Sequence, residues 1–156
     1  MADPAVGLGF DVHTFATGRE LWLGGLLFAG EQGLAGHSDG DVVCHAIADA
    51  LFGAVALGDV GEHFPDSDPG SAGLAGSELL ERTLRVLADH GRVPVSLDVT
   101  LVCERPAIAP RRLEMRDRLA VISEVPVDRV SVKATRPEGL GLSGDGIGCL
   151  ALAVVG

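Results

Sequence analysis

Two histidines and one aspartate give this chain a set of side chains suited to binding a metal ion. Asp11 and His13 end the run Gly-Leu-Gly-Phe-Asp-Val-His at 7–13, and His45 follows the acidic stretch His-Ser-Asp-Gly-Asp at 37–41. Two imidazoles and one carboxylate suit zinc, and three protein ligands leave the fourth tetrahedral position open. A structural zinc site would close that position, usually with cysteine. The trio therefore predicts a zinc site at which a substrate oxygen binds the metal.

The aspartates near His45 in the sequence could have one of two roles. On a helix, Asp41, His45 and Asp49 fall at i, i+4 and i+8, so they share one polar stripe. Both carboxylates could then orient the ligating imidazoles from outside the metal site. Asp39, Gly40 and Asp41 also resemble part of a calcium loop, but the glutamate of the twelfth position and other oxygen ligands are missing. Calcium is therefore the weaker alternative.

His37 and Ser38 stand just ahead of the helix expected to carry His45. The N–H groups at the amino terminus of a helix point outward and favour an anion. The pair is therefore a candidate for gripping a phosphate or for stabilising charge that develops in a reaction. A capping-region histidine with no chemical role is an equal alternative at this point.

The composition favours one folded domain over 1–156 and narrows the range of partners. The 156 residues are 47% hydrophobic, so the chain is long enough to bury a core. A formal net charge of −10 with a single lysine, Lys133, argues against nucleic acid, which needs clustered cations. No apolar run reaches the roughly 18 residues that span a bilayer. Residues 1–4 lack the basic start of a signal peptide. We therefore expect no membrane partner and a cytoplasmic location.

The cysteines support a reducing environment. The chain has an odd number of cysteines, which are widely spaced and form no C-x-x-C pair: Cys44, Cys103 and Cys149. This pattern is typical of reduced thiols and not of a disulfide framework. We expect three small buried hydrophobic residues.

Apolar periodicity and turn residues predict an α/β (α+β) fold. We expect a mixed four-stranded sheet, a small hairpin, and helices packed on one face of the sheet. Ser38 or Asp39 is expected to cap the first helix, Gly91 to close the second and Pro110 to open the third. The expected strands cover 5–10, 20–23, 26–28, 96–103, 129–134 and 147–155. The expected helices cover 38–57, 77–89 and 110–123.

Three long motifs carry a resemblance to a known family. They are Gly-x-Asp-Val-His-x-Phe at 9–15, Gly-His-Ser-Asp-Gly-Asp-Val-x-x-His-Ala-x-x-Asp-Ala-Leu at 36–51, and Ala-Leu-Gly-Asp-Val-Gly-x-x-Phe-Pro-Asp-Ser-Asp-Pro at 56–69. Shorter matches follow at 98–100, 105–106 and 132–135. Together they resemble the 2-C-methyl-D-erythritol 2,4-cyclodiphosphate synthase family over essentially the whole chain.

That resemblance implies a homotrimer of α/β subunits with active sites between neighbouring subunits. It implies zinc on Asp11, His13 and His45, and a second divalent cation, magnesium or manganese, on Glu138. The implied substrate is 4-diphosphocytidyl-2-C-methyl-D-erythritol 2-phosphate. Its 2-phosphate would attack the β-phosphorus, form the cyclic diphosphate and expel CMP. The implied enzyme is a phosphorus–oxygen lyase of non-mevalonate isoprenoid precursor synthesis, and its metal ions would let an acidic protein bind a polyanion.

The resemblance also implies which residues contact the substrate. His37 and Ser38 would contact the methylerythritol end, residues 103–109 would wrap the cytosine through backbone groups, and Thr135 would touch the diphosphate. The implied substrate-binding set is Asp11, His13, His37, Ser38, Asp59, Gly61, Phe64, Pro65, Asp66, Ser67, Asp68, Cys103, Pro106, Ala109, Thr135, Arg136 and Glu138.

One departure from the family pattern falls at the implied catalytic residues. Arg136 and Pro137 follow Thr135 where the family has further threonines, and the first replaced threonine is assigned to transition-state stabilisation. We expect Arg136 to take that catalytic role, alongside His37, through a charge-assisted contact with phosphate. Lys133 is either a substrate contact or part of a salt bridge at a strand end, and we favour the salt bridge.

Other departures concern the ligands. Ala107 stands where a lysine is common near the cytidine phosphate, and Leu142 and Asp145 stand where a phenylalanine and an arginine are frequent near the three-fold axis. Three symmetry-related carboxylates would repel an isoprenoid diphosphate, so we expect no such ligand in the central cavity.

Two competing functions remain at this stage. A zinc phosphodiesterase would use water in place of the 2-phosphate as nucleophile. A non-catalytic trimer would use zinc structurally or sense nucleotides, and only the Arg136-Pro137 replacement favours it.

Overall fold

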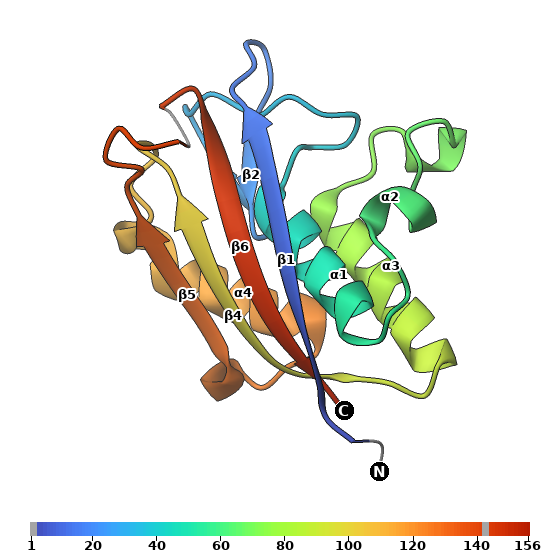
Figure 1. Cartoon of the computed structure of the whole chain (residues 1–156). Coiled ribbons are helices and arrows are strands. Elements are labelled where there is room, and N and C mark those ends of the chain that lie inside the picture. The colour runs from blue at the N-terminus through green and yellow to red at the C-terminus, as the bar shows by residue number, and fades with distance from the viewer. Residues whose placement is uncertain (1–2, 142–143) are drawn as a thin grey trace.

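The computed structural model describes residues 3–141 and 144–156, and its centre is a mixed four-stranded sheet (Figure 1). The strand order is β1-β6-β4-β5. Strand β6 runs antiparallel to both β1 and β4, whereas β4 and β5 are parallel. The strands are β1 Ala5–Thr14, β4 Pro94–Val102, β5 Val130–Thr135 and β6 Gly146–Val155. The predicted mixed sheet is confirmed.

The three longer helices lie on one side of this sheet, behind it in the view of Figure 1, as predicted. Helices α1 (Val42–Ala54) and α4 (Arg112–Ser123) contact the sheet, and α3 (Gly76–Asp89) packs against both helices. None of the described helices has the length and apolar character to cross a bilayer. The remaining elements are the hairpin β2 (Leu21–Leu23) and β3 (Leu26–Phe28), the short helix α2 (Val60–His63), and single 3-10 turns at Pro69–Ser71, Ala109–Arg111 and Val127–Arg129.

The core lies between the sheet and the helices. Alternate residues of each strand point toward the helices because strand side chains alternate between faces. On β4 these are Leu97, Val99 and Leu101, as the alternation predicts. Cys44, Cys103 and Cys149 are buried and free, which confirms the reading of the cysteines as small core residues. Burial raises the pKa of all three thiols, that of Cys103 to about 11.

Two glycines let α1 lie directly on β1. A Cβ atom added at Gly7 would stand 1.9 Å from the carbonyl oxygen of Ala50, and one at Gly9 would stand 1.9 Å from that of Ala46. Only residues without a side chain permit this approach of backbone to backbone. The approach brings the first half of β1 against the middle and end of α1.

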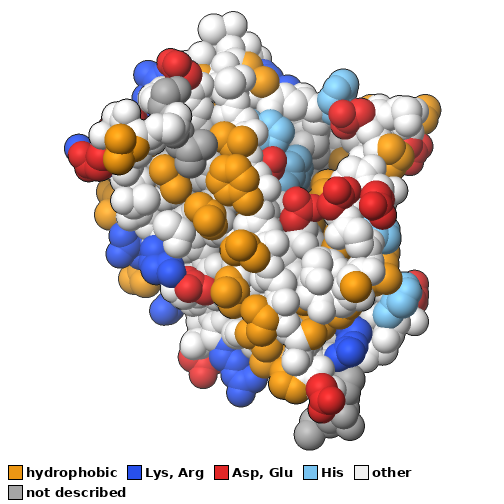
Figure 2. Space-filling model, viewed as in Figure 1, with side chains coloured by type: hydrophobic (Ala, Val, Ile, Leu, Met, Phe, Trp, Pro, Cys, Tyr) orange, Lys and Arg blue, Asp and Glu red, His pale blue; other side chains and the backbone are white. Residues whose placement is uncertain are grey.

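The other face of the sheet is open and apolar. Figure 2 shows hydrophobic side chains gathered along the strands on this face. The exposed members on the two neighbouring strands β1 and β6 are Val6, Leu8, Phe10, Val12, Leu150 and Leu152. We call these six residues the open-face patch. A contiguous apolar patch of this kind usually marks an interaction surface.

Several predicted boundaries were wrong. Pro110 lies in the 3-10 turn Ala109–Arg111 and does not open α4, which begins at Arg112. Strand β1 continues to Thr14, four residues beyond the predicted end, because it pairs with β6 over its full length. Helix α1 is capped by Asp41, not by Ser38 or Asp39, because Gly40 has a φ of +74° and interrupts the helix before it. The same helix ends at Ala54, before the predicted end at residue 57, and Asp59 caps the separate short helix α2. Leu142 lies outside the described residues.

Candidate metal centre and substrate cleft

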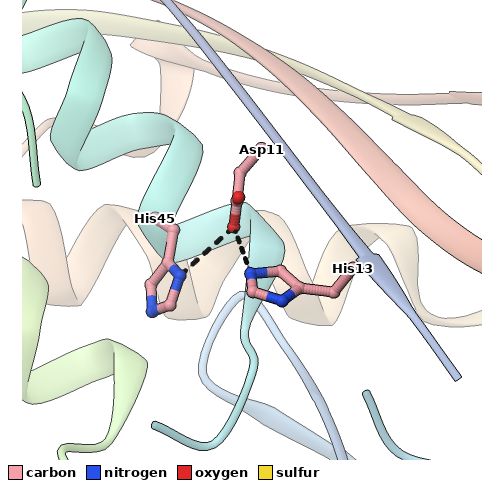
Figure 3. A group of neighbouring side chains, drawn as sticks. All are labelled: Asp11, His13 and His45. Carbon is pink, nitrogen blue, oxygen red and sulfur yellow. Dashed lines mark hydrogen bonds and ion pairs between the residues drawn. The ribbon is translucent and has the colours of Figure 1, made fainter. Parts of the chain in front are cut away.

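The structure brings Asp11, His13 and His45 together, as predicted (Figure 3). Asp11 and His13 point to the same side because they are two residues apart on β1. His45 comes from the first turn of α1. The Oδ2 atom of Asp11 lies 2.9 Å from Nε2 of His13 and 3.2 Å from Nδ1 of His45. The three side chains therefore converge on one point between strand and helix.

The charges of this trio stabilise one another. Burial disfavours the Asp11 carboxylate, but the bonds to His13 and His45 outweigh it and hold the pKa of Asp11 well below its ordinary value. Burial also disfavours a charged His45, yet the bond with Asp11 and the charges of Asp11, Asp41 and Asp39 raise the pKa of His45. Without a metal, the site therefore favours an ionised aspartate beside a protonated histidine.

The trio fits a divalent metal ion of the zinc type. Each residue offers one ligand atom, and the three atoms lie within 4.8 Å of one another. Nitrogen and carboxylate ligands in this number suit zinc with one open position. Glu138, the implied ligand of a second cation, lies in the exposed loop after β5 and does not join this group.

The acidic residues beside the trio bond to backbone amides. The buried Asp41 carboxylate accepts hydrogen bonds from the N–H groups of Val43 and Cys44 in α1 and of Gly24 and Gly25 in the hairpin. This carboxylate thus joins the hairpin to the start of α1. The prediction that it orients an imidazole by direct contact was wrong, because backbone donors occupy both of its oxygens.

The carboxylates of Asp39 and Asp49 also accept hydrogen bonds from backbone N–H groups. Asp39 accepts hydrogen bonds from the N–H groups of Asp41 and Gly76, and Asp49 accepts one from Val60. The carboxylate oxygens of Asp39 and Asp41 thus accept hydrogen bonds from N–H groups, which contradicts the calcium-loop alternative. Asp49 does not bond to His45, so its predicted orienting role was wrong as well.

The loop before α1 is held by a residue that sequence reasoning missed. The guanidinium of Arg19 donates hydrogen bonds to the carbonyl oxygens of Gly36 and Ser38. The hydroxyl oxygen of Ser38 accepts a hydrogen bond from the N–H of Gly40 and lies 3.1 Å from Nε2 of His45. Arg19 is far from this loop in sequence and belongs to no motif, so no sequence signal pointed to it.

A cleft of about 340 Å³ opens beside the trio. Its walls come from β1, α1, the loop before α1, and the segment around α2. Asp49 also faces this cleft, although it was not among the predicted substrate contacts. Of the residues predicted to contact substrate, the lining includes Asp11, His13, His37, Ser38, Asp59, Gly61, Phe64 and Asp66. Pro65, Ser67 and Asp68 do not line it, and Asp68 instead accepts a hydrogen bond from the N–H of Gly70.

His37 reaches the cleft, but not through the helix terminus. Its side chain is 71% exposed, and its Nε2 lies 3.5 Å from Oδ2 of Asp66 across the cleft. The predicted anion site at the amino terminus of α1 was wrong, because Asp41 accepts hydrogen bonds from the first N–H groups of that helix. The exposed side chain of His37 can still contact an anion in the cleft.

A second pocket, of about 250 Å³, is lined by five of the other predicted contacts but not by Glu138. Cys103, Pro106, Ala109, Thr135 and Arg136 line it together, and the N–H of Cys103 donates to the carbonyl oxygen of Thr135. The second pocket and the cleft have no lining residue in common.

The two pockets belong to opposite edges of the sheet. Asp11 and His13 lie on β1, which is one edge strand, and Thr135 ends β5, which is the other. One chain alone therefore does not bring the two predicted halves of the site together. Lys133, on β5, binds Asp98 of β4 at 2.7 Å, so the expected salt bridge is confirmed, although it lies within the two strands and not at a strand end.

The fold and the trio define a class: single α/β domains with an Asp-His-His metal site between an edge strand and a helix. The model of the YgbB family matches residues 5–156, and this chain belongs to that family. The 2-C-methyl-D-erythritol 2,4-cyclodiphosphate synthase of Chloroherpeton thalassium is 49% identical over 149 residues, with 96% of this chain and 95% of the relative covered. A bifunctional enzyme IspD/IspF of Caulobacter vibrioides is 48% identical over 150 residues.

The relatives differ in length. The match to the Caulobacter enzyme covers 96% of this chain but only 39% of the relative. Among solved structures, a 2C-methyl-D-erythritol-2,4-cyclodiphosphate synthase with bound CDP superposes with a TM-score of 0.90 at 33% identity, covering 97% and 99% of the two chains. The bifunctional IspDF from Campylobacter jejuni gives a TM-score of 0.92 at 33% identity, covering 98% of this chain and 42% of that one.

Proposed function

We propose that this chain cyclises 4-diphosphocytidyl-2-C-methyl-D-erythritol 2-phosphate to 2-C-methyl-D-erythritol 2,4-cyclodiphosphate and releases CMP. The observation that carries this proposal is the Asp11–His13–His45 trio, open to a cleft, in a member of a family whose relatives bear this synthase's name. The enzyme is a lyase that breaks a phosphorus–oxygen bond. The free, buried cysteines support a reducing compartment, and we place the reaction in the cytoplasm.

The residues suit a reaction between two phosphates. The nucleophile is already an anion, so the site needs charge neutralisation and in-line positioning more than a strong base. Zinc bound by Asp11, His13 and His45 would supply a Lewis acid for a phosphate oxygen. Ser38 and His37 would hold the 2-phosphate end, and Asp59 would accept hydrogen bonds from substrate hydroxyls.

The second pocket suits the nucleotide end. Backbone groups of 103–109 would hold the cytosine, and Thr135 and Arg136 would contact the diphosphate. Arg136 is exposed at this pocket, and its guanidinium would stabilise charge that develops on the phosphoryl group. Glu138, two residues further on, would hold a second cation, magnesium or manganese, on the diphosphate.

A homotrimer would unite the two half-sites. The cleft at β1 of one chain would face the second pocket, at β5, of its neighbour. The open-face patch supports this assembly, since burying six apolar side chains between subunits is favourable.

Phosphorus NMR of the products tests the proposed reaction. The cyclase converts the substrate to the cyclic diphosphate and CMP in equal amounts. A linear phosphate product would identify a zinc phosphodiesterase, and unchanged substrate with magnesium and zinc present would favour a binding protein.

A further inference from the structure

The ring of His45 has a partner at each of its two nitrogens. Nδ1 faces Oδ2 of Asp11 at 3.2 Å, and Nε2 faces the hydroxyl oxygen of Ser38 at 3.1 Å. The same hydroxyl oxygen accepts the N–H of Gly40, at 3.1 Å. Ser38 therefore belongs to the surroundings of the metal ligand as well as to the cleft.

A neutral imidazole carries its proton on only one nitrogen, and the hydrogen bond of the other nitrogen decides which one. The nitrogen that faces Asp11, and so the metal position, is Nδ1. To offer a lone pair there, His45 must carry its proton on Nε2, and that N–H needs an acceptor. Among the described residues, the Ser38 hydroxyl is the partner of Nε2.

We propose that Ser38 is a positioning residue, which holds His45 in the Nε2–H tautomer and so presents Nδ1 to the metal. This inference depends on the proposed metal site but not on the cyclisation. Outer partners that fix a ligating histidine in this way typically change metal affinity by about 10- to 100-fold.

The loop geometry supports this role. Arg19 donates to the carbonyl oxygens of Gly36 and Ser38, so the backbone that carries the hydroxyl is fixed on both sides of His37. The N–H of Gly40 donates a hydrogen bond to the Ser38 hydroxyl oxygen and so restrains it from the other side. The hydroxyl is thus held in place before any metal binds.

The arrangement has a consequence for the cleft. When the Ser38 oxygen accepts hydrogen bonds from the N–H groups of both Gly40 and His45, the Ser38 O–H group is free to donate a hydrogen bond to another acceptor. Ser38 lines the cleft, so that proton is available to an anionic oxygen such as one of a phosphate. In the opposite tautomer, Nδ1–H donates to Asp11 and the Ser38 hydroxyl must donate to Nε2. Metal binding at Nδ1 excludes this tautomer and so keeps the Ser38 proton available to a ligand.

Zinc affinity of the full chain, measured by competition with a chelator, tests the proposal without relying on activity. We expect Ser38→Ala to weaken zinc binding by about tenfold or more, and Ser38→Thr to restore it to within about threefold, since threonine keeps the hydroxyl. Ser131→Ala removes an exposed hydroxyl from β5 and should leave the affinity unchanged. A Ser38→Ala protein that binds zinc as tightly as the wild type would overturn the proposal.

A measurement on the wild type covers the case in which Ser38→Ala does not fold. In the zinc-loaded, nitrogen-15-labelled protein, two-bond proton–nitrogen correlations should show His45 protonated at Nε2. Protonation at Nδ1 would overturn the proposal. Neither readout requires the substrate, so both can succeed when the product assay fails, and the two proposals fall separately.

Discussion

The carboxylate of Asp49 accepts a hydrogen bond from the backbone N–H of Val60, with 2.8 Å between Oδ1 and N. Asp49 lies one turn beyond His45 on α1, and Val60 begins α2. The bond therefore fixes the cleft wall that carries Asp59 and Gly61 against the helix that carries His45. Burial and the charges of Asp59 and Asp11 raise the pKa of Asp49, although the N–H of Val60 opposes this.

Replacing Asp49 should affect substrate binding more than metal binding. A hydrogen bond to a charged group is worth about 1.5–3 kcal/mol, so we expect Asp49→Ala to raise KM by about tenfold or more with zinc affinity unchanged. Asp49→Asn keeps an acceptor for Val60 and is the matched control, with a smaller effect. An unchanged KM in Asp49→Ala would show that substrate binding does not depend on the hydrogen bond between Asp49 and the α2 segment.

Gly9 should be essential to the spacing of the metal ligands. A methyl group there would collide with the carbonyl oxygen of Ala46, which pushes α1 away from β1. We expect Gly9→Ala to lower the free energy of unfolding by about 1–3 kcal/mol and to weaken zinc binding. In Gly53→Ala, the methyl group meets nothing within 4 Å, so the same change should raise stability by about 0.5–1 kcal/mol. Urea unfolding and zinc titration measure both variants.

The open-face patch should hold the oligomer together. Leu8 is 69% exposed in the single chain, and an arginine there would place an unpaired charge in the proposed subunit interface. We expect Leu8→Arg to yield single chains in analytical ultracentrifugation, whereas the wild type sediments as a trimer. Val121 is 71% exposed on α4, and Val121→Arg should leave the trimer intact. A Leu8→Arg trimer would contradict the proposed interface.

The metal-free protein should show a pH dependence that originates in Asp11 and His45. The pKa of Asp11 is lowered from 3.8, so its contribution to stability is present above about pH 4 and lost as pH falls through the lowered value. The pKa of His45 is raised from 6.5, so its contribution is complete below that pH and lost as pH rises through the raised value.

We therefore expect His45→Gln to lower the urea midpoint of zinc-free protein more at pH 5.5 than at pH 8.5. His90→Gln, which alters an exposed histidine bonded to the carbonyl oxygen of Val86, should show no such difference. Zinc affinity should change in the opposite direction and rise with pH, because protons compete with the metal for His45. An equal loss at both pH values would contradict the charge pair.

Arg136 should matter to the rate. It lines the second pocket beside Thr135, in the position where the family pattern has a threonine. We expect Arg136→Ala to lower kcat by more than a few-fold and Arg136→Lys to lower it less, since lysine keeps the charge but not the forked geometry. Arg82→Ala, at an exposed salt bridge with Glu78, is the control. Unchanged kinetics in Arg136→Ala would mean that Thr135 acts alone.

The features that could be predicted from the sequence depend on the types and spacing of nearby residues. The alternation of Leu97, Val99 and Leu101 predicted a strand, and the residue types of Asp11, His13 and His45 predicted a metal site. The predicted first strand ended at residue 10, so it did not place Asp11 and His13 on one strand face. The roles of Asp41 and Asp49 could not be predicted in this way. Their partners, Gly24, Gly25 and Val60, donate from the backbone, which has the same chemistry in every residue and leaves no pattern.

The most direct test of the central claim is the zinc dependence of cyclisation, followed by phosphorus NMR in excess magnesium. Zinc-free wild-type protein should be inactive and should regain formation of the cyclic diphosphate with one zinc ion per chain. His45→Ala should stay inactive although folded and trimeric. If His45→Ala cyclises the substrate as fast as the wild type, the Asp11–His13–His45 trio is not the catalytic metal site.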